Sequence, residues 1–590
     1  MTTVKERPGG GSGDSGAGQE GITARGRLAW RTWPAGLLGL IGRHRLISLA
    51  LLAGVLPRLL SMIAYQPAVL FRLDTFDYLY GAVHVAPNPI NPSGYSLFLW
   101  LLKPFHSLVL ITALQHVMGL AIAVMVYALL RRRGLPSWGA TLAALPVLFD
   151  PGQLLLEQFI MADLLALLLM VASFVILLWE RRPSALRSAV AGLLMGVSVT
   201  VRPTTIVFIV LMAVYLLVQR AGWRRAGAAL AAGVIPVFAY MGWFAAANGS
   251  FNLTNSNGLF LWSRTTSFAR CSVIKPSPRL APLCPERQPG DLAQVNPALR
   301  GLPKHYLWDH DAWQWQPPSR AFVPDTAAFT SAKNSLALQF AVHAILSEPL
   351  SYLHIVALDS AKPFYQIQSN VLRFPAHQPS SKTLQSYNWR YAIGTVRAYT
   401  GSDQGVSPYL GYQFGFRLEL PWSYYMQDYQ NHIFLPGPAF AVIVGAGLIG
   451  ILLPRRRTSA ALLLWVCAMI AVVLPIAEHE YTYRYVIPAV PLVCIALALA
   501  FRNQARDALA EPAAERPAQA AGPGPAGTQQ DGGAGHEGEG AGHEGGAARE
   551  REAQHRNGDG PTDNATQPGA GTQPGGGVLP APGNPSPGAS

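Results

Sequence analysis

The stretch that decides the fold is DLLALLLMVASFVILLWERRPSALRSAVAGLLMGVSVTVRPTTIVFIVLMAVYLLVQR, residues 163–220. Three apolar runs follow one another in it, and a cluster of Arg separates the first run from the second. A helix rises 1.5 Å per residue, so about 20 apolar residues span the roughly 30 Å hydrocarbon core of a bilayer. The stretch therefore predicts transmembrane helices joined by short connections.

Similar apolar runs recur on both sides of this stretch. Ten are found, near 46–64, 108–130, 138–150, 160–179, 187–200, 204–219, 228–247, 435–453, 459–476 and 486–501. Two of them, 138–150 and 187–200, are short for a perpendicular crossing. The pattern predicts an all-α polytopic membrane protein with about ten transmembrane helices in a lipid bilayer.

The basic residues between the runs predict an orientation. They fall in alternate connections: Arg131, Arg132, Arg133, then Arg181, Arg182, Arg187, then Arg220, Arg224, Arg225, then Arg455, Arg456 and Arg457. The positive-inside rule assigns these connections to the cytoplasm of a plasma membrane protein. With an even number of spans both termini are cytoplasmic, and 65–107, 248–434 and 477–485 face outward.

Composition divides the rest of the chain. Of 590 residues 50% are hydrophobic and 13% charged, with a net charge of +13, which excludes a single soluble domain. Because Arg in cytoplasmic loops explains the excess, no nucleic-acid partner is expected. We expect these regions: a basic cytoplasmic head (1–45), a seven-helix domain with first outer loop 65–107 (46–247), an extracytoplasmic domain (248–434), three C-terminal helices (435–501) and a cytoplasmic tail (502–590). Gly- and Pro-rich composition predicts disorder in head and tail.

The 248–434 segment has no apolar run long enough to cross a membrane, and we expect mixed secondary structure there. It is rich in aromatic residues, among them Trp308, Trp313, Trp315 and Trp389. Its stretch 338–364 has helical apolar spacing interrupted at Pro349, which predicts two short amphipathic helices. Cys271 and Cys284 could form a disulfide if the segment faces an oxidising compartment.

Acids are scarce in residues 46–247, and five of the six lie on the predicted outer side: Asp74, Asp77, Asp150, Glu157 and Asp163. Their clustering suggests an active site at the outer membrane surface. Helix capping or simple solvation is the alternative for each one. If 71–82 is helical, Asp74, Asp77 and Gly81 share a face, whereas Glu157 and Asp163 are about 240° apart on a helix. Of these two, Asp163 is the better candidate.

Three Arg residues could serve the same outer site. Arg202 precedes Pro203 between two apolar runs, Arg484 opens the last run, and Arg58 lies within the first. An Arg in such a run often snorkels to the interface, which is the alternative for Arg58. A guanidinium also binds phosphate in bidentate fashion, so these residues are candidates for a lipid-phosphate site.

Several motifs in order resemble the GT-C superfamily of membrane glycosyltransferases. They are an outer-loop Asp with an aromatic-rich helix (Asp74 to Tyr80), PSGYSLFLWLL (92–102), Asp163 before a helix, VRPTT (201–205), SEPLSYL (347–353) and RYVIPAVPL (484–492). The chain resembles in particular the bacterial relatives of protein mannosyltransferases and aminoarabinose transferases, over roughly residues 46–501. Such relatives often carry a second acid directly after the Asp, where this chain has Thr75.

The resemblance implies an inverting glycosyltransferase that takes a hexosyl or pentosyl group from a polyprenyl-phosphate donor on the outer membrane face. Its acceptor would be a cell-envelope glycan, a lipid or a protein. Asp74 falls at the position of the general base, and a base without a covalent intermediate gives inversion. The expected substrate-binding residues are Asp77, Glu157, Asp163, Arg58, Arg202 and Arg484.

Other catalytic signatures are missing from the sequence, including a Walker A loop, HExxH and CxxC. The sequence predicts no cofactor or metal site, and it leaves open whether a divalent cation takes part. Glu478, His479 and Glu480 are consecutive, so we interpret them as a solvated turn. A membrane transporter or lipid flippase is the alternative function, but the apolar runs show no paired halves. A membrane anchor presenting a binding domain would leave the outer acids unexplained.

Overall fold

The structure is a computed structural model, and it describes residues 41–71, 74–285, 303–308, 329–365, 386–390, 395–399, 406–412, 415–453 and 459–502. Most of the head and tail for which we predict disorder lies outside these residues, as do Trp313, Trp315 and Arg455–Arg457. The chain divides into two compact units, and every described residue belongs to the first, Met1–Ala513.

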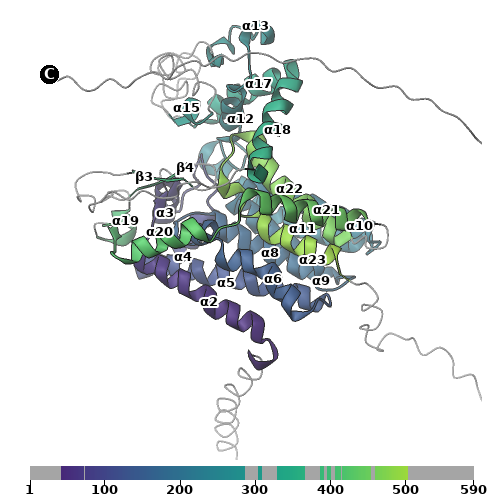
Figure 1. The fold of residues 1–590 in the computed structure, drawn as a ribbon. Coiled ribbons are helices and arrows are strands. Elements are labelled where there is room, and N and C mark those ends of the chain that lie inside the picture. Colours follow the sequence, from purple (N-terminus) through teal and green to yellow (C-terminus); the bar gives the residue numbers. More distant parts are fainter. Residues whose placement is uncertain are drawn as a thin grey trace, which may run out of the picture. The chain divides into compact units, whose positions relative to one another are not determined.

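Each of the ten predicted apolar runs forms a helix, and the membrane part of the fold is built from them (Figure 1). The first part of the chain contains α2 (Arg45–Ala64), α3 (Asp74–His84), α4 (Gly94–Leu102), α5 (Leu108–Arg132), α6 (Ser137–Phe149), α7 (Pro151–Gln158), α8 (Asp163–Leu178), α9 (Ala185–Val201), α10 (Ile206–Val218) and α11 (Trp223–Asn248). The last three helices are α21 (Gly437–Leu452), α22 (Ser459–Glu478) and α23 (Ala489–Ala500).

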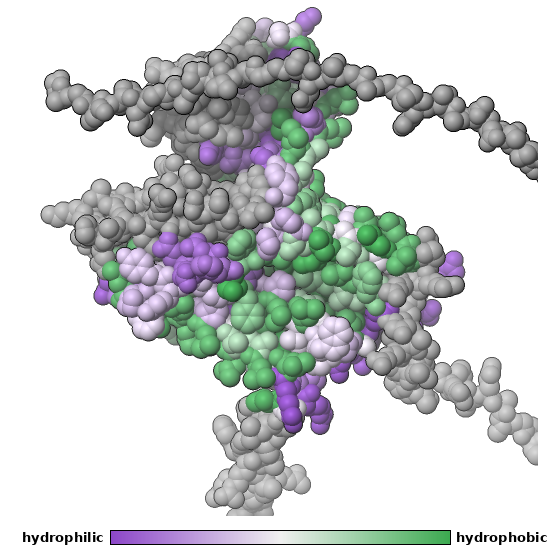
Figure 2. Space-filling model, in the orientation of Figure 1, coloured by the Kyte–Doolittle hydropathy of each residue, from purple (hydrophilic) through white to green (hydrophobic). Residues whose placement is uncertain are grey.

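The protein is a multi-pass helical membrane protein. Within the described ranges, α2, α5, α11 and α22 are long and apolar enough to cross a membrane, and the number rises to 7 if each of three bent helix pairs counts as one span. Four of the expected spans, at α8, α9, α10 and α23, are shorter apolar helices. The exposed side of α2 carries Leu49, Leu52, Leu56 and Leu59, at 50–67% exposure, as a lipid-facing surface requires. Figure 2 shows hydrophobic residues spread over the surface of the helical region.

Small residues set the closest helix contact. A Cβ added to Gly192 in α9 would lie 2.0 Å from the carbonyl oxygen of Ala229 in α11, and one added to Gly196 would lie 2.0 Å from that of Gly233. The two backbones therefore touch, as in small-xxx-small packing of transmembrane helices. Ser198 adds a hydrogen bond to the carbonyl of Ala166 in α8 (3.1 Å), which joins a third helix to the pair.

The segment after α11 forms short helices that lie apart from the apolar runs in sequence. They are α12 (Asn257–Thr265), α13 (Cys271–Ile274), α15 (Pro303–Trp308), α17 (Ser331–Ser347), α18 (Pro349–Tyr365), α19 (Ser407–Leu410) and α20 (Trp422–His432). The predicted pair of helices around Pro349 is present, since α17 and α18 meet there at an angle of 99°. Gly258 of α12 packs directly on the backbone of Asn334 in α17, and its N–H donates to the Asn334 side-chain oxygen at 2.7 Å.

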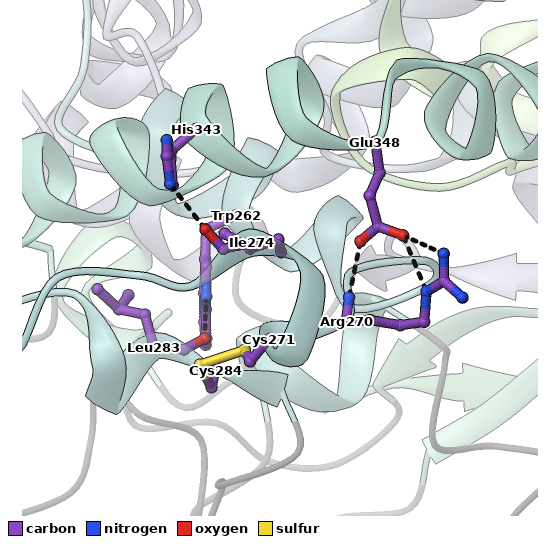
Figure 3. The surroundings of a disulfide bond; sticks show 8 residues. All are labelled: Trp262, Arg270, Cys271, Ile274, Leu283, Cys284, His343 and Glu348. Carbon is purple, nitrogen blue, oxygen red and sulfur yellow. Dashed lines mark hydrogen bonds and ion pairs between the residues drawn. A yellow bond between two sulfur atoms is a disulfide. The ribbon is translucent and has the colours of Figure 1, made fainter.

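A disulfide joins Cys271 to Cys284 and closes the turn between α13 and the following short helix (Figure 3). Beside it, the indole N–H of Trp262 donates to the carbonyl of Leu283 at 2.8 Å. His343 of α17 hydrogen-bonds the carbonyl of Ile274 at 3.0 Å. These contacts attach the disulfide-closed turn to both α12 and α17.

Short antiparallel strands connect the predicted first outer loop, 65–107, to the later segment 248–434. They are β1 (Tyr65–Gln66), β2 (Leu70–Phe71), β3 (Ser386–Arg390), β4 (Thr395–Tyr399) and β5 (Arg417–Leu418), paired as β1–β5 and β2–β4–β3. In the register, Leu70 is opposite Tyr399 and Tyr65 is opposite Leu418. The expected boundary between 46–247 and 248–434 stays a prediction, but the two regions share these sheets. Because β2 leads into α3, the pairing fixes where the first outer loop begins its helix.

Candidate active site

A cavity of about 300 Å³ lies where the predicted outer ends of several helices meet. Four of the seven candidate site residues line it: Asp74, Asp163, Arg202 and Arg484. They come from the starts of α3 and α8, the end of α9 and the connection before α23. The fold thus brings together charged residues that are up to 410 positions apart in the sequence.

Asp74 is the first residue of α3, and its carboxylate is bound by Arg484. The guanidinium Nη1 of Arg484 donates to Asp74 Oδ2 at 3.1 Å. The same guanidinium lies over the ring of Phe71, 5.0 Å from its centroid, and over that of Tyr485 at 5.2 Å. Both charged side chains are largely buried, at 13% and 15% exposure, which strengthens their attraction.

Thr75, the residue that replaces the second acid of the family motif, has a structural contact here. Its hydroxyl accepts a hydrogen bond from the backbone N–H of Phe71 (2.8 Å) and donates to the carbonyl of Ile160 (3.0 Å). It therefore ties the start of α3 to the segment that precedes Asp163. This link positions Asp74 and Asp163 relative to each other.

A second ion pair joins Asp163 and Arg202. Asp163 begins α8 with a side chain 5% exposed, and Arg202 follows α9 with a side chain 20% exposed. Arg202 is extended rather than helical because Pro203 follows it. The Nε atoms of Arg202 and of Arg484 are buried without a hydrogen-bond partner among the described residues. Each guanidinium therefore keeps donors that a ligand in the cavity could use.

Asp77 lies one turn after Asp74 and stays next to the cavity without lining it. Its Oδ2 accepts a hydrogen bond from Asn91, which does line the cavity, at 3.4 Å. Burial and then the negative charge of Asp74 raise the pKa of Asp77 to about 7, against the opposing effect of hydrogen bonds from Asn88 and Asn91. Asp77 can thus change its charge near neutral pH.

Arg58 and Glu157, which the sequence assigns to substrate binding, do not line this cavity. Arg58 Nη2 donates to Glu157 Oε1 at 2.8 Å, and the two side chains are 3% and 0% exposed. His116 Nδ1 lies 2.8 Å from Glu157 Oε2, and Gln153 donates to Glu157 Oε1 at 3.0 Å. We call these four residues the Glu157 cluster. It joins α2, α5 and α7, so its observed role is in helix packing. Glu157 and Asp163 lie on different helices, α7 and α8, and of the two only Asp163 lines the cavity.

The turn 478–480 differs from its sequence interpretation. His479 is 7% exposed, so the expected solvated turn is wrong for this residue. Its Nδ1 lies 2.9 Å from the hydroxyl oxygen of Ser263 in α12. Burial, together with the charges of Arg484 and Arg264, lowers the pKa of His479 to about 3, so the ring is neutral. Glu478 and Glu480 line the cavity beside it.

Other cavity residues come from the segment 248–434, and sequence reasoning missed them. Asn257 and Phe260 of α12 and Lys304 of α15 line the same cavity. Tyr78 is also near: its buried ring lies on α3, and its hydroxyl has no hydrogen-bond partner within the described ranges. Burial raises the pKa of Tyr78, with smaller effects from Arg202, Asp74 and Asp163. Tyr78 comes four residues after Asp74, so the two share a helix face, and this spacing could have been noticed.

No group of three or more His, Cys, Asp or Glu side chains within the described ranges is arranged to hold a metal ion. The cavity is lined by the carboxylates of Asp74 and Asp163 and by the guanidinium groups of Arg202 and Arg484. Such a set can bind a phosphate and accept a proton from a hydroxyl group.

One protein family matches part of the chain. Residues 101–253 match the sequence model of the dolichyl-phosphate-mannose-protein mannosyltransferases. The match includes Asp163 and Arg202 and leaves Asp74 and Arg484 outside it. It confirms the predicted resemblance to protein mannosyltransferases over this part of the chain. No curated protein matches the chain.

Two solved structures are similar in part. One is ArnT from Cupriavidus metallidurans bound to undecaprenyl phosphate, with 14% identity over 77% of this chain and 76% of that one and a TM-score of 0.32. The other is the apo oligosaccharyltransferase of Archaeoglobus fulgidus, with 13% identity over 77% of this chain and 50% of that one and a TM-score of 0.31.

Proposed function

We propose that this membrane protein is an inverting glycosyltransferase that moves a hexosyl or pentosyl group from a polyprenyl-phosphate donor to an extracytoplasmic acceptor. The observation that carries the proposal is the pairing of two buried acids with two Arg residues in one cavity, Asp74 with Arg484 and Asp163 with Arg202. The mannosyltransferase family match, which names a lipid-phosphate sugar, supports the same donor class.

Arg484 and Arg202 are assigned to the donor phosphate. Each guanidinium already contacts one carboxylate, which holds the planar group in place while other N–H donors stay available. Because their side chains are largely buried, two such groups stabilise the negative charge that develops on the departing phosphate. Phosphate binding by Arg484 would also weaken its hold on Asp74.

Asp74 is assigned to the general base. Its Oδ2 contacts Arg484, and Oδ1 has no hydrogen-bond partner among the described residues. In the reaction the acceptor hydroxyl oxygen forms a bond to the anomeric carbon, and the bond from that carbon to the phosphate oxygen breaks. The hydroxyl proton goes to Asp74, and the bonding electron pair leaves with the polyprenyl phosphate. One displacement without a covalent intermediate inverts the anomeric centre.

Asp163 and Asp77 are assigned to the sugar. Asp163 faces the cavity, and carboxylate oxygens are good acceptors for sugar hydroxyl groups. Asp77 acts through Asn91, which lines the cavity and hydrogen-bonds to it. The Glu157 cluster has no part in these contacts.

The extracytoplasmic segment is assigned to the acceptor. Asn257, Phe260 and Lys304 form part of the wall of the cavity that the two ion pairs also line. Aromatic and amide groups suit a glycan, a lipid headgroup or an extended peptide. In the proposed orientation this wall and the cavity lie at the outer face of the plasma membrane, and both termini are cytoplasmic.

The experiment is sugar transfer by the purified full-length protein. The donor is a radiolabelled polyprenyl-phosphate sugar, and the product is released polyprenyl phosphate together with labelled acceptor. Asp74→Asn keeps the shape of the side chain and removes the base, so turnover should fall by about 10²–10⁴-fold. Asp428→Asn is the matched control, because Asp428 is exposed in α20 and should keep full turnover. Full turnover by Asp74→Asn with normal thermal stability would overturn the assignment.

A further inference from the structure

A second cavity, of about 870 Å³, lies between α6, α23 and the start of α21. It shares no residue with the active-site cavity. Its wall is almost entirely apolar and includes Trp138, Leu142, Phe149, Leu435, Leu497 and Phe501. We call it the α6 groove. Nothing in the proposed transfer reaction uses it.

The groove follows one face of α6 from end to end. Leu135, Trp138, Leu142, Leu145 and Phe149 line it at helical spacing. The 13 residues of α6 extend about 20 Å, so the groove is long and narrow. Trp138 and Leu142 are 65% and 59% exposed, so this wall is open to the hydrocarbon phase. A single extended hydrocarbon chain fits this shape better than a compact ligand.

The two ends of the groove differ in charge. Tyr483, which precedes α23, contacts Asp150 at the far end of α6, and the 12 residues of α23 extend about 18 Å, so Arg502 lines the groove at the Gly134 end. Arg131 lies at the same end, because its guanidinium donates to the carbonyl of the groove residue Leu135, and Arg132 is exposed beside it. At the other end, Asp150 lines the groove and accepts a hydrogen bond from Tyr483 at 3.2 Å. A negatively charged headgroup is therefore favoured at the Arg end alone.

This polarity distinguishes the ligand from the proposed donor. The donor phosphate has to reach Arg202 and Arg484, which lie beyond the Asp150 end. A phosphate at Arg502 would be about 20 Å away along α6, too far for its sugar to reach Asp74. The headgroup at the Arg end belongs to a different lipid, whose chain runs toward the site from the opposite leaflet.

We propose that the α6 groove binds one anionic phospholipid, with an acyl chain along α6 and its phosphate at Arg502 and Arg131. Basic pockets between transmembrane helices on the cytoplasmic side are typical sites for anionic headgroups, and in the proposed orientation the Arg end faces the cytoplasm. The lipid fills the space between α6, α21 and α23 and holds the C-terminal helices against the first half of the chain. The inference does not depend on the proposed glycosyl transfer.

The test uses delipidated full-length protein in detergent and measures lipid binding by native mass spectrometry together with the shift in Tm. The probes are phosphatidylglycerol, phosphatidylcholine and polyprenyl phosphate. We expect one tightly retained phosphatidylglycerol that raises the Tm, with phosphatidylcholine weaker. Arg502→Gln should weaken phosphatidylglycerol by at least about tenfold, because a charge-assisted contact is lost. Leu142→Trp should block the groove.

Two control variants separate the site from general lipid contacts. Leu186→Trp adds the same ring at an exposed position of α9, and Arg224→Gln removes an exposed Arg of another connection. Both should bind phosphatidylglycerol as the parent protein does. Equal binding of the two phospholipids with no effect of Arg502→Gln would overturn the proposal. Tighter binding of polyprenyl phosphate than of phosphatidylglycerol, with that binding lost in Leu142→Trp, would also overturn the proposal. It would identify the groove as a binding site for the donor lipid.

Discussion

Replacing Glu157 by Gln should destabilise the protein strongly without changing the chemistry of the active-site cavity. The carboxylate is fully buried and contacts Arg58, His116 and Gln153. Gln keeps the shape but leaves the Arg58 guanidinium buried without a counter-charge. Removing one partner of a buried ion pair costs about 3–5 kcal/mol. For a chain of this size, with an unfolding entropy of about 2.1 cal/mol/K per residue, we expect a fall in Tm of about 3–5 °C.

The assay is thermal unfolding of the purified protein in detergent, followed by turnover per folded molecule. Glu180→Gln is the control, because its ion pair with Arg187 is exposed and should contribute less than about 1 kcal/mol. The double variant Arg58→Met with Glu157→Gln should be less destabilised than the sum of the single variants.

A third variant approaches the same cluster sterically. A Cβ added to Gly119 would lie 1.8 Å from Glu157 Oε1, so Gly119→Ala must displace the carboxylate. It should lower the Tm as Glu157→Gln does. An unchanged Tm in both variants would refute the stabilising role of the cluster. A normal Tm together with lost turnover would instead support the assignment of Glu157 to substrate binding.

Three further predictions concern the site and the segment 248–434. Because the folded state raises the pKa of Asp77 to about 7, the native state loses stability as the pH rises from about 4 to 7. The Tm of Asp77→Asn should therefore be higher than that of the parent at pH 8 and equal to it near pH 4, which a series of Tm measurements against pH would test. Arg484→Gln should raise the KM for the donor by at least about tenfold. Arg484→Lys should raise the KM less, because Lys keeps the positive charge but lacks the planar guanidinium. Equal KM values for the parent and Arg484→Gln would contradict the phosphate assignment. Cys271→Ser should cost about 3 kcal/mol, because the bond to Cys284 closes a loop of sequence separation 13, and limited proteolysis of the extracytoplasmic segment should accelerate; an unchanged rate would contradict this.

Helices were predictable because hydrophobicity alone marks them in a membrane protein. All ten apolar runs are helical, and Pro349 marks the bend between α17 and α18. The helix α7 was missed because its sequence, PGQLLLEQ, is short and mixed, and Asp150 caps it through the backbone N–H of Gly152. The strands were missed because β1 and β2 have two residues each and exist only through pairing with β5 and β4.

The site was predictable in part. The position of acids at the predicted outer ends of helices singled out Asp74 and Asp163, and both line the cavity. Their Arg partners could be named as candidates but not paired, since the pair Asp74–Arg484 spans 410 positions. Arg58 was grouped with them because nothing in its sequence shows that Glu157 neutralises it. Lys304 and the 478–480 turn reach the cavity only through tertiary packing.

The most direct test of the central claim is a structure of the full-length protein with a bound polyprenyl phosphate. The claim is that the two Asp–Arg pairs form one site for a lipid-linked sugar. We expect the phosphate within hydrogen-bonding distance of the guanidinium groups of Arg202 and Arg484, with the Asp74 carboxylate facing the side where the sugar attaches. A phosphate bound elsewhere, with both ion pairs unchanged and the cavity empty, would contradict the claim.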